Sequence, residues 1–294
     1  MSTLMQQPQE QRPSSRALTS QCSVYLTKLF ASFAAARLNR MQTIRTKPQK
    51  HSLPGLLVVS LTSYSRRFQQ LSLTLKSLLR QTTSPDNIIL WIADDERHLL
   101  PENVTHLQRY GLTIASCPDI FSYKKLIPTL ILFPHAFIVT VDDDLYLYPR
   151  WLEDIVSEYR GDRRVVIGAR AHWIALAEGN QPAPYTTWGY EQGQSIPSPH
   201  NFPTTGAGVL FPPDVFHPSV LNIDKALSLC RMADDVWFYW MFRLNGAMAK
   251  ATRRRHRLIE WNQKQSEPLW RANVCGGGND HALNEMHREF GFPI

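Results

Sequence analysis

The stretch Ala136–Asp144, AFIVTVDDD, decides how the rest of the chain is read. Its apolar, β-branched residues up to Val141 predict a buried strand. Three aspartates follow at once, at the end of the strand where open α/β sheets collect their ligands. Because adjacent carboxylates repel one another, a divalent cation such as Mg²⁺ or Mn²⁺, which prefers oxygen ligands, would stabilise them. The alternative is a helix N-terminus, since Asp is favoured at caps and a helical pattern begins at Trp151.

Side chains alternate along an extended segment, so Asp142 and Asp144 are expected to point one way and Asp143 the other. This spacing predicts an Asp-x-Asp pair with a third acid behind it. The cation ligands expected from the sequence are therefore Asp142 and Asp144.

Strand and helix patterns alternate on both sides of this stretch. Such an order predicts βαβ units, that is, an α/β fold with a mainly parallel sheet flanked by helices on both faces. The region 171–204 has little periodicity and is too long for an ordinary connection, which is typical of a binding loop. The expected strands are 56–61, 87–92, 112–115, 136–141, 164–169 and 209–211, and the expected helices are 66–81, 121–132, 151–160, 232–244 and 279–290.

Composition and charge limit the classes of function. The chain has 294 residues, of which 43% are hydrophobic, as in a globular protein with a substantial core. Its formal charge of +7 belongs to residues 1–50, which hold eight Lys or Arg and one Glu. The remaining residues hold 24 basic and 24 acidic side chains. A neutral body argues against a nucleic-acid partner, which would need a basic face on the fold.

Cysteine usage and hydropathy bear on the compartment. The four cysteines are widely spaced and form no C-x-x-C pair, so a reducing compartment is the simpler expectation. No apolar stretch reaches the roughly 20 residues of a membrane span. A long polar leader before Val24 also disfavours a cleaved signal peptide. The expected location is the cytoplasm, including the inner face of the cytoplasmic membrane.

The chain divides into three expected units. Residues 1–21 are rich in Gln, Ser and Pro and are expected to form a disordered leader, and residues 51–294 the α/β domain. Between them, residues 22–50 are basic and include an expected helix over 22–44 with an apolar stripe. Such a helix could adsorb as a peripheral anchor to anionic lipid, or it could pack on the protein's own surface. The sequence leaves both possibilities open.

The motifs, taken in order, resemble a nucleotide-sugar-dependent glycosyltransferase of the GT-A fold, a Rossmann-like fold. They are similar to the family 2-like enzymes of bacterial capsule and lipopolysaccharide synthesis, and the resemblance covers about residues 53–290. The motifs that carry it are VVSLTSYSRR (58–67), IILWIADDE (88–96), SYKKLIP (122–128), IVTVDDDLYLYP (138–149), TTGAGVLFPP (204–213), ADDVWFYW (233–240) and NDHALNE (279–285).

The resemblance implies a metal site and a base. Asp144 would bind Mn²⁺ or Mg²⁺ directly, Asp142 would hold the metal or the ribose, and His281 would complete the metal shell. Asp235, or in its place Asp234, would be the general base that takes the proton of the acceptor hydroxyl. Read without the resemblance, either acid could simply cap the helix that follows, and His281 could be an ordinary surface residue.

The resemblance also implies a donor site. Asp94 and Asp95 would lie near the nucleobase and ribose, and Lys124 would reach phosphate or base. The family usually continues after the acids with Gly and Ser, whereas this chain has Glu96 and Arg97. The identity of the donor's nucleobase is therefore open. The alternative reading of this acid pair is a turn.

Small and aromatic side chains complete the expected site. Gly206 and Gly208 would border the donor sugar and the acceptor, although a tight turn alone would also explain them. The aromatic residues of the long loop suit a saccharide acceptor, or they form a satellite core under the loop. They are Trp173, Tyr185, Trp188 and Tyr190.

The implied function is metal-dependent transfer of a sugar from a nucleotide-sugar donor, expected to be a UDP-sugar. The acceptor would be a saccharide or lipid-linked saccharide, and transfer would invert the anomeric carbon. One rival is a sugar nucleotidyltransferase, which usually carries a Gly-rich loop that the segment 60–67 lacks. A second rival is a non-catalytic glycan-binding or membrane-binding module. A third, a two-metal nuclease, would need a basic groove.

Overall fold

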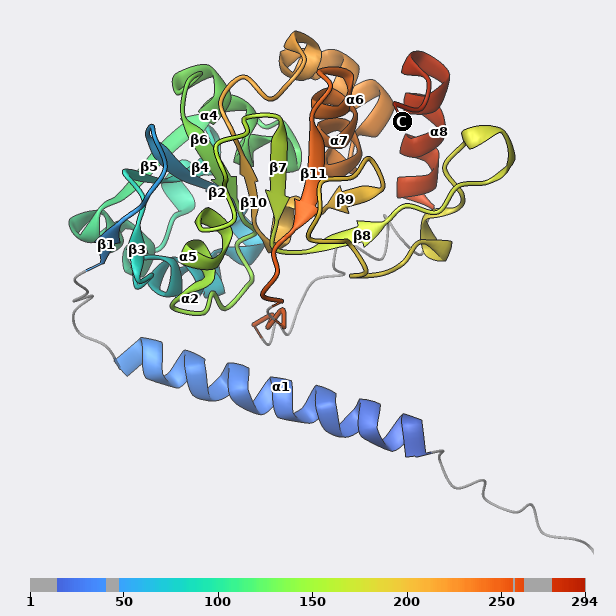
Figure 1. Ribbon diagram of the computed structural model, residues 1–294. Coiled ribbons are helices and arrows are strands. Elements are labelled where there is room, and N and C mark those ends of the chain that lie inside the picture. Colours follow the sequence, from blue (N-terminus) through green and yellow to red (C-terminus); the bar gives the residue numbers. More distant parts are fainter. Residues whose placement is uncertain (1–14, 41–47, 256, 262–276, 294) are drawn as a thin grey trace, which may run out of the picture.

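A seven-stranded sheet forms the centre of the molecule (Figure 1). The computed structural model describes residues 15–40, 48–255, 257–261 and 277–293. In order across the sheet, the strands are β11 (Met248–Ala251), β7 (Val165–Gly168), β10 (Val209–Phe211), β6 (Phe137–Thr140), β2 (Leu57–Thr62), β4 (Asn87–Ala93) and β5 (Leu112–Cys117).

Neighbouring strands of this sheet pair in parallel except at β10, which is antiparallel to both β6 and β7. The α/β fold with a mainly parallel sheet flanked by helices, expected from the sequence, is therefore confirmed. The reversal of β10 has a consequence for the site. Val209, which opens β10, pairs with Thr140, which closes β6, so the residues before β10 meet the residues after β6.

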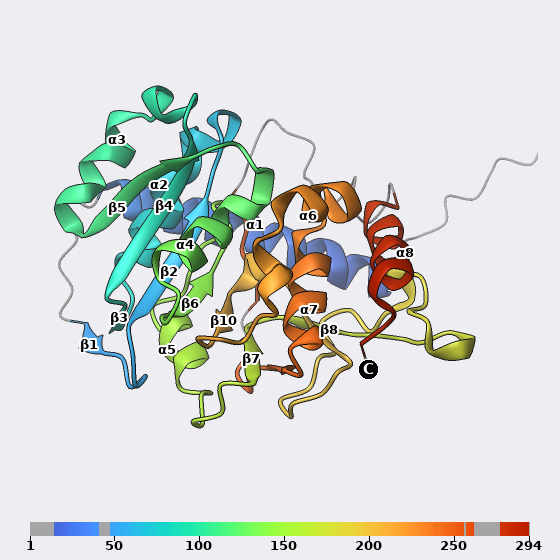
Figure 2. The same ribbon diagram turned by 90° about the horizontal axis from the view of Figure 1, so that it is seen from above.

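Each central strand feeds two cores, one on each face of the sheet, because its apolar side chains alternate. Leu57 and Val59 of β2 contribute to the core that is covered by α2 (Phe68–Leu78), α3 (Glu102–Thr105) and α5 (Trp151–Val156). Val58 contributes to the opposite core. That core is covered by the 3₁₀ turn η4 (Phe121–Lys125), α4 (Ile127–Leu132), α6 (Ile223–Cys230), α7 (Asp234–Leu244) and α8 (Gly278–Phe290). Figure 2 shows α6, α7 and α8 gathered at the end of the sheet away from β5.

The expected helix over 121–132 is broken in the structure. Leu126 leaves the helical region, with φ −129° and ψ −47°, and divides η4 from α4. Pro128 explains the break, because it has no N–H to donate and is tolerated in the first turn of a helix. The break matters for the site because it sets the direction of the two lysines that end η4.

Several elements lie outside the expected pattern, among them α3, α6, β11 and a small sheet in the long loop. That sheet pairs β8 (Ala171–Trp173) with β9 (Asn201–Pro203) in an antiparallel arrangement. A second small sheet joins β1 (Gln49–Lys50) to β3 (Thr83–Ser84) in parallel. The further 3₁₀ turns are η1 (Ser65–Arg67), η2 (Arg97–Leu99), η3 (His106–Tyr110), η5 (Glu178–Asn180), η6 (Tyr185–Thr187), η7 (Thr205–Ala207) and η8 (Pro218–Leu221).

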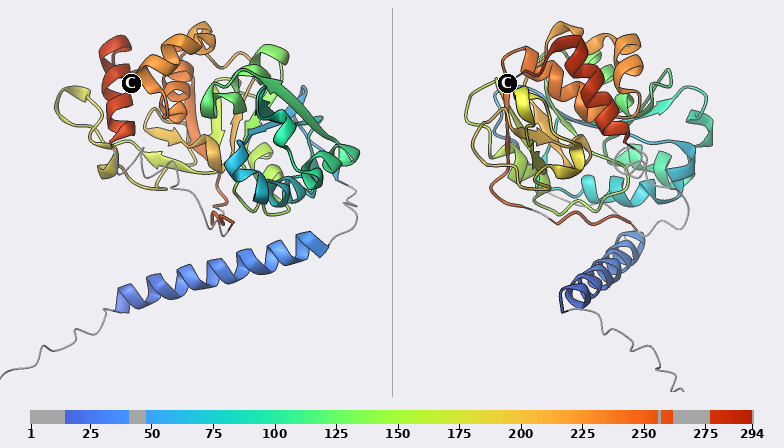
Figure 3. Two further views of the ribbon diagram at one scale, coloured as in Figure 1. Left: turned by 180° about the vertical axis from the view of Figure 1, so that it is seen from behind. Right: turned by 90° about the vertical axis from the view of Figure 1, so that its right-hand side faces the viewer.

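The N-terminal helix α1 (Ser15–Arg40) runs along one side of the body (Figures 1 and 3). It begins within the segment expected to be disordered, and the end of the expected helix, beyond Arg40, lies outside the described residues. Its buried residues, Ala34 and Leu38, pack against Leu73 of α2 and against Trp261. None of the helices in the described ranges is both long and apolar enough to cross a membrane.

Candidate active site

Two acidic groups meet at the carboxyl edge of the parallel strands. The first acidic group, Asp142, Asp143 and Asp144, follows β6 after one residue, Val141. The second acidic group, Asp234 and Asp235, opens α7. Between them lies η7. It directly precedes β10 in the chain, and because β10 is antiparallel to its neighbours, η7 lies at the carboxyl edge of the parallel strands. The backbone N–H of Asp142 donates to the carbonyl of Gly206 in η7 at 3.0 Å. The reversal of β10 thus brings residues of distant sequence position to one site.

Lys125 joins the two acidic groups. Its Nζ lies 2.8 Å from Asp142 Oδ1 and 3.2 Å from Asp234 Oδ2, and it donates to Thr205 Oγ1 at 3.0 Å. The lysine is buried. Burial alone would lower the pKa of Lys125, but the nearby carboxylates, Asp142 foremost, raise it above its usual value. The ammonium group is therefore charged at every ordinary pH and holds both groups in place.

Arg67, in η1 after β2, neutralises the rest of the first acidic group. Its Nη1 lies 2.7 Å from Asp143 Oδ1 and 3.0 Å from Asp144 Oδ2. Ser63 donates a short hydrogen bond to the other oxygen of Asp143, and Thr74 donates to its carbonyl at 2.7 Å. Asp143 is buried and has a positioning role in this turn.

The expected alternation of the three aspartates is wrong. The strand ends at Thr140, and Asp143 and Asp144 belong to a turn. In a turn successive side chains need not point to opposite sides, so Asp143 and Asp144 converge on the same nitrogen of Arg67. Asp142 points instead toward Lys125. The three carboxylates are therefore divided between two cations.

The acids of the first group differ in charge state. Burial alone would raise the pKa of Asp142, but the Lys125 ammonium group lowers it below its usual value. Burial raises the pKa of Asp143. Burial, together with the charge of Asp143, raises the pKa of Asp144 to about 7. Asp142 is thus ionised at neutral pH, whereas Asp144 holds its proton to a higher pH than an ordinary aspartate does.

The second acidic group is held by hydroxyl and backbone donors. Thr205 donates to Asp235 Oδ1 from its backbone N–H at 2.8 Å and from its hydroxyl at 2.5 Å. Ser122 donates to Asp234 Oδ1 at 2.8 Å. Burial, together with the charge of Asp234, raises the pKa of Asp235 to about 6. Neither acid caps α7, because the N-cap residue is Ala233 and no side chain closes the cap.

Negative charge is in surplus at this edge. The two groups contain five carboxylates, and the ion pairs of the described residues bring them two cations, Arg67 and Lys125. When every acid is ionised, five negative charges and two positive charges leave three negative charges unbalanced. The raised pKa values of Asp144 and Asp235 are consistent with this surplus of negative charge, which a divalent cation would relieve.

The oxygen donors present suit Mg²⁺ or Mn²⁺, although a complete ligand set is not formed. Within the described ranges, no three His, Cys, Asp or Glu side chains are arranged to hold a metal ion. His281 lies in α8 and is exposed. Its side chain makes no hydrogen bond or ion pair with the residues that the structure describes. Its role as a metal ligand therefore stays a prediction, as does the metal itself.

Two of the expected donor residues, Asp94 and Lys124, lie near Cys117, which ends β5. The charges of Lys124 and Asp94 both act on its thiol, and burial raises the pKa of Cys117 to about 11. Asp94 and Asp95 are exposed in the turn after β4. Lys124 is already paired, through a short contact, with Asp119. No described hydrogen bond or ion pair joins these residues to the first acidic group.

Each predicted glycine makes room for a particular neighbour. A Cβ on Gly206 would lie 2.1 Å from Asp142 Oδ2, so only glycine lets this carboxylate approach η7. Gly208 has φ +117°, and a Cβ there would lie 2.6 Å from the Trp151 ring. Whether either residue also borders a bound sugar stays a prediction.

The aromatic residues of the long loop divide into core and surface. Trp188 is buried and packs on Phe202, with ring centroids 5.1 Å apart, and on Tyr185 at 4.8 Å. Tyr190 is 65% exposed and stacks on His172 at 4.7 Å. Trp188 therefore belongs to the main core on the α7 face of the sheet and not to a separate satellite core, whereas Tyr190 lies at the surface.

Sequence analysis missed Lys125, Arg67, Thr205 and Ser122. Lys125 stands beside Lys124 in the same motif, and the pair gave no sign of which lysine would face the acids. Arg67 closes the motif VVSLTSYSRR, in which nothing distinguishes it from the neighbouring Arg66. The signal that could have revealed it is the need of three adjacent acids for cations.

Comparisons with known proteins give distant likenesses. No protein-family model matches the sequence, and no curated protein matches it. Among solved structures, the chain is similar to S. aureus TarS residues 1–349 in complex with UDP, with 12% identity and a TM-score of 0.46. The match covers 79% of this chain and 65% of that one. A second crystal structure of S. aureus TarS 1–349 is similar with 14% identity and a TM-score of 0.45, and the match covers 81% of this chain and 74% of that one.

Proposed function

We propose that this chain is a metal-dependent glycosyltransferase of the GT-A type. It would transfer a sugar from a nucleotide-sugar donor, expected to be a UDP-sugar, to a hydroxyl of a saccharide or lipid-linked saccharide. The observation that carries the proposal is the surplus of carboxylates at the carboxyl edge of the sheet, where the described ion pairs bring two cations to five acids. The order of the motifs along the chain supports it.

Asp142 and Asp144 are the residues that would hold Mn²⁺ or Mg²⁺, with His281 as the expected third ligand. When bound, the cation would neutralise the charge that grows on the leaving diphosphate. Arg67 and Lys125 would fix the carboxylates before the donor arrives, so that little reorganisation is needed on binding.

Asp235 would act as general base, with Asp234 second in line. Its raised pKa, about 6, makes it a stronger proton acceptor than an ordinary aspartate while leaving it mostly ionised at neutral pH. Thr205 would orient it through two hydrogen bonds to Oδ1. Attack by the acceptor from the face opposite the diphosphate would invert the anomeric carbon.

The donor would extend from the first acidic group toward Cys117. Asp94 and Asp95 would contact nucleobase and ribose, and Lys124 would contact phosphate or base after exchanging its partner Asp119. The acceptor would approach from the side of Gly206 and the long loop. A role in bacterial surface polysaccharide synthesis, on the cytoplasmic side of the membrane, completes the proposal.

The test is a screen of the purified full chain against a panel of nucleotide sugars, read as release of nucleoside diphosphate. Release is expected with Mn²⁺ or Mg²⁺ and should stop in EDTA. The exposed acid Asp224 provides a matched control, since Asp224→Asn removes one carboxylate outside the site.

Two outcomes would contradict the proposal. Release of pyrophosphate from a sugar 1-phosphate and a nucleoside triphosphate would assign the chain to the nucleotidyltransferases. Binding of glycan or nucleotide without any turnover, with or without metal, would make it a non-catalytic module.

A further inference from the structure

Helix α1 has two faces of different character. Ala31, Ala34 and Leu38 are buried against the body, where Ala34 and Leu38 meet α2 and Trp261. Phe30 lies at the edge of this face and contacts the Tyr146 ring at 5.4 Å. The small side chains let the helix lie close to the body, and this inward face accounts for how α1 is held.

The opposite face carries larger apolar groups. We define the outward face of α1 by residues whose spacing places them on one side of the helix, away from Ala31 and Ala34. Its apolar side chains are well exposed: Tyr25 70%, Leu26 60%, Leu29 66% and Phe33 68%. Single exposed apolar residues are normal, but four large ones on one helix face mark an interaction site. The outward face comprises Tyr25, Leu26, Leu29, Phe33, Arg37 and Arg40.

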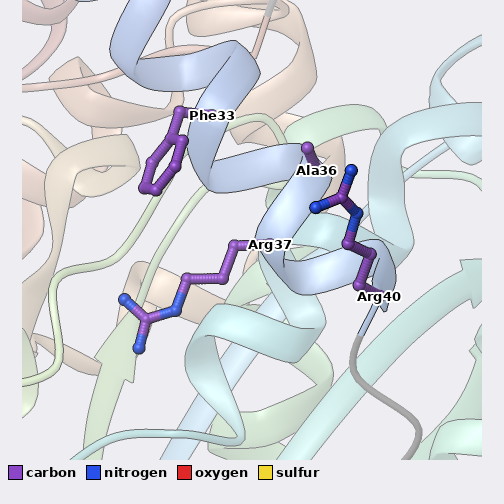
Figure 4. Close-up of a pocket in the computed structure, with 4 residues that line it drawn as sticks. All are labelled: Phe33, Ala36, Arg37 and Arg40. Atoms are coloured by element: carbon purple, nitrogen blue, oxygen red, sulfur yellow. The ribbon is translucent and has the colours of Figure 1, made fainter.

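A groove lies at the basic end of the outward face (Figure 4). It has a volume of about 380 Å³, and each described residue that lines it belongs to α1: Phe33, Ala36, Arg37 and Arg40. Ala36 lies beside the Arg40 guanidinium group, and the Arg37 side chain extends in another direction (Figure 4). Guanidinium groups match the geometry of phosphate oxygens. In the described part of the chain, neither Arg37 nor Arg40 forms an ion pair.

Charge decides what covers this face. Helix α1 contains four basic residues and no acidic one, in a chain whose residues after position 50 are neutral. Exposed apolar side chains beside basic ones complement the surface of an anionic membrane, through apolar burial and attraction to the lipid phosphates. A second copy of the chain would set the arginines of one outward face against those of the other, which like-charge repulsion opposes.

We propose that α1 docks the protein on an anionic phospholipid surface through the outward face. Leu26, Leu29 and Phe33 enter the boundary between headgroups and acyl chains. Arg37 and Arg40 bind lipid phosphates at the groove. The inward face keeps the body attached, so that the helix acts as a rigid peripheral anchor. This inference is independent of the chemistry at the active site.

The test measures binding of the full chain to vesicles by flotation. The protein is expected to bind phosphatidylcholine vesicles that contain phosphatidylglycerol and to bind vesicles of phosphatidylcholine alone only weakly. Binding to the anionic vesicles should weaken as the salt concentration is raised. Each arginine near an anionic surface contributes about 1 kcal/mol, or about a fivefold change in affinity. Arg37→Gln with Arg40→Gln should therefore weaken binding about 30-fold. Leu29→Ser with Phe33→Ser should abolish it.

Matched controls change the same chemistry elsewhere on the surface. Arg109→Gln with Ile131→Ser removes an exposed basic and an exposed apolar side chain from the body and should leave binding unchanged. Circular dichroism should show that all variants stay folded, because the inward face is untouched. Absence of binding to the anionic vesicles, or equal binding by the outward-face variants, would overturn the proposal. If sedimentation shows a dimer that the outward-face substitutions convert to monomer, the outward face binds a second copy of the chain, and the proposal is overturned as well.

Discussion

Lys125 contacts both acidic groups of the site, but Asp142 and Asp235 are held by different kinds of partner. Arg67 and Lys125 hold the first group through ion pairs, and Asp142 is kept ionised by Lys125. In the second group, Lys125 pairs with Asp234, whereas Asp235 is held by the backbone N–H and hydroxyl of Thr205, and burial raises its pKa to about 6. A carboxylate pinned by a cation suits binding, whereas one held by neutral donors suits proton transfer. The difference indicates a division of labour within one cluster.

The sharpest test of this division is Asp235→Asn. An amide of the same shape can accept the hydrogen bonds of Thr205 but cannot take a proton. Loss of a general base costs about 10²- to 10⁴-fold in rate, so transfer should fall on the order of 10³-fold. Donor affinity, measured by calorimetry, should be unchanged. Normal transfer by this variant would show that Asp235 is not the general base, and Asp234→Asn would then be the next variant to measure.

The reciprocal change is Asp144→Asn. Removing a carboxylate that would bind the cation should weaken metal-dependent donor binding by about 100-fold, since such an ion contributes several kcal/mol. The measurement is calorimetry with UDP in Mn²⁺ and in EDTA. Asp224→Asn should bind as the unaltered chain does. If Asp144→Asn and the unaltered chain bind UDP equally in Mn²⁺, the first group is not a metal site.

A smaller effect is expected from pH. Asp235 must be ionised to accept a proton, and burial, with the charge of Asp234, raises its pKa to about 6. Below that pH the carboxyl is protonated and inactive, so the rate should rise about tenfold between about pH 5 and about pH 7. A flat initial-rate profile at saturating donor across this range would remove Asp235 from the rate-limiting proton transfer.

Much of the fold could be predicted because long apolar runs define the central strands. β4 and β10 begin where the sequence indicates, and the mainly parallel order follows from alternating strands and helices. β11 could not be predicted, since Met-Ala-Lys-Ala has no strong strand preference and is held by pairing with β7. The reversal of β10 also escapes local patterns, because strand direction is decided by long-range packing.

The candidate site was predicted in its acids but not in their counter-ions. Arg67 and Asp143 are 76 residues apart, and no local pattern reports such a contact. Lys124 and Lys125 look alike in sequence, yet Lys125 faces the acids and Lys124 turns to Asp119. That choice depends on the 3₁₀ geometry of η4 and on the break at Leu126, which a continuous helix would not have.

The close approach of Gly206 to Asp142 limits how this site can be redesigned. Since any Cβ at position 206 would collide with the carboxylate, a saturation library should return only glycine there among active clones. Tyr190, exposed at the rim, should tolerate many residues. Substitutions that alter ligand preference are therefore expected to be tolerated at the rim of the long loop, whereas position 206 beside Asp142 tolerates almost no substitution.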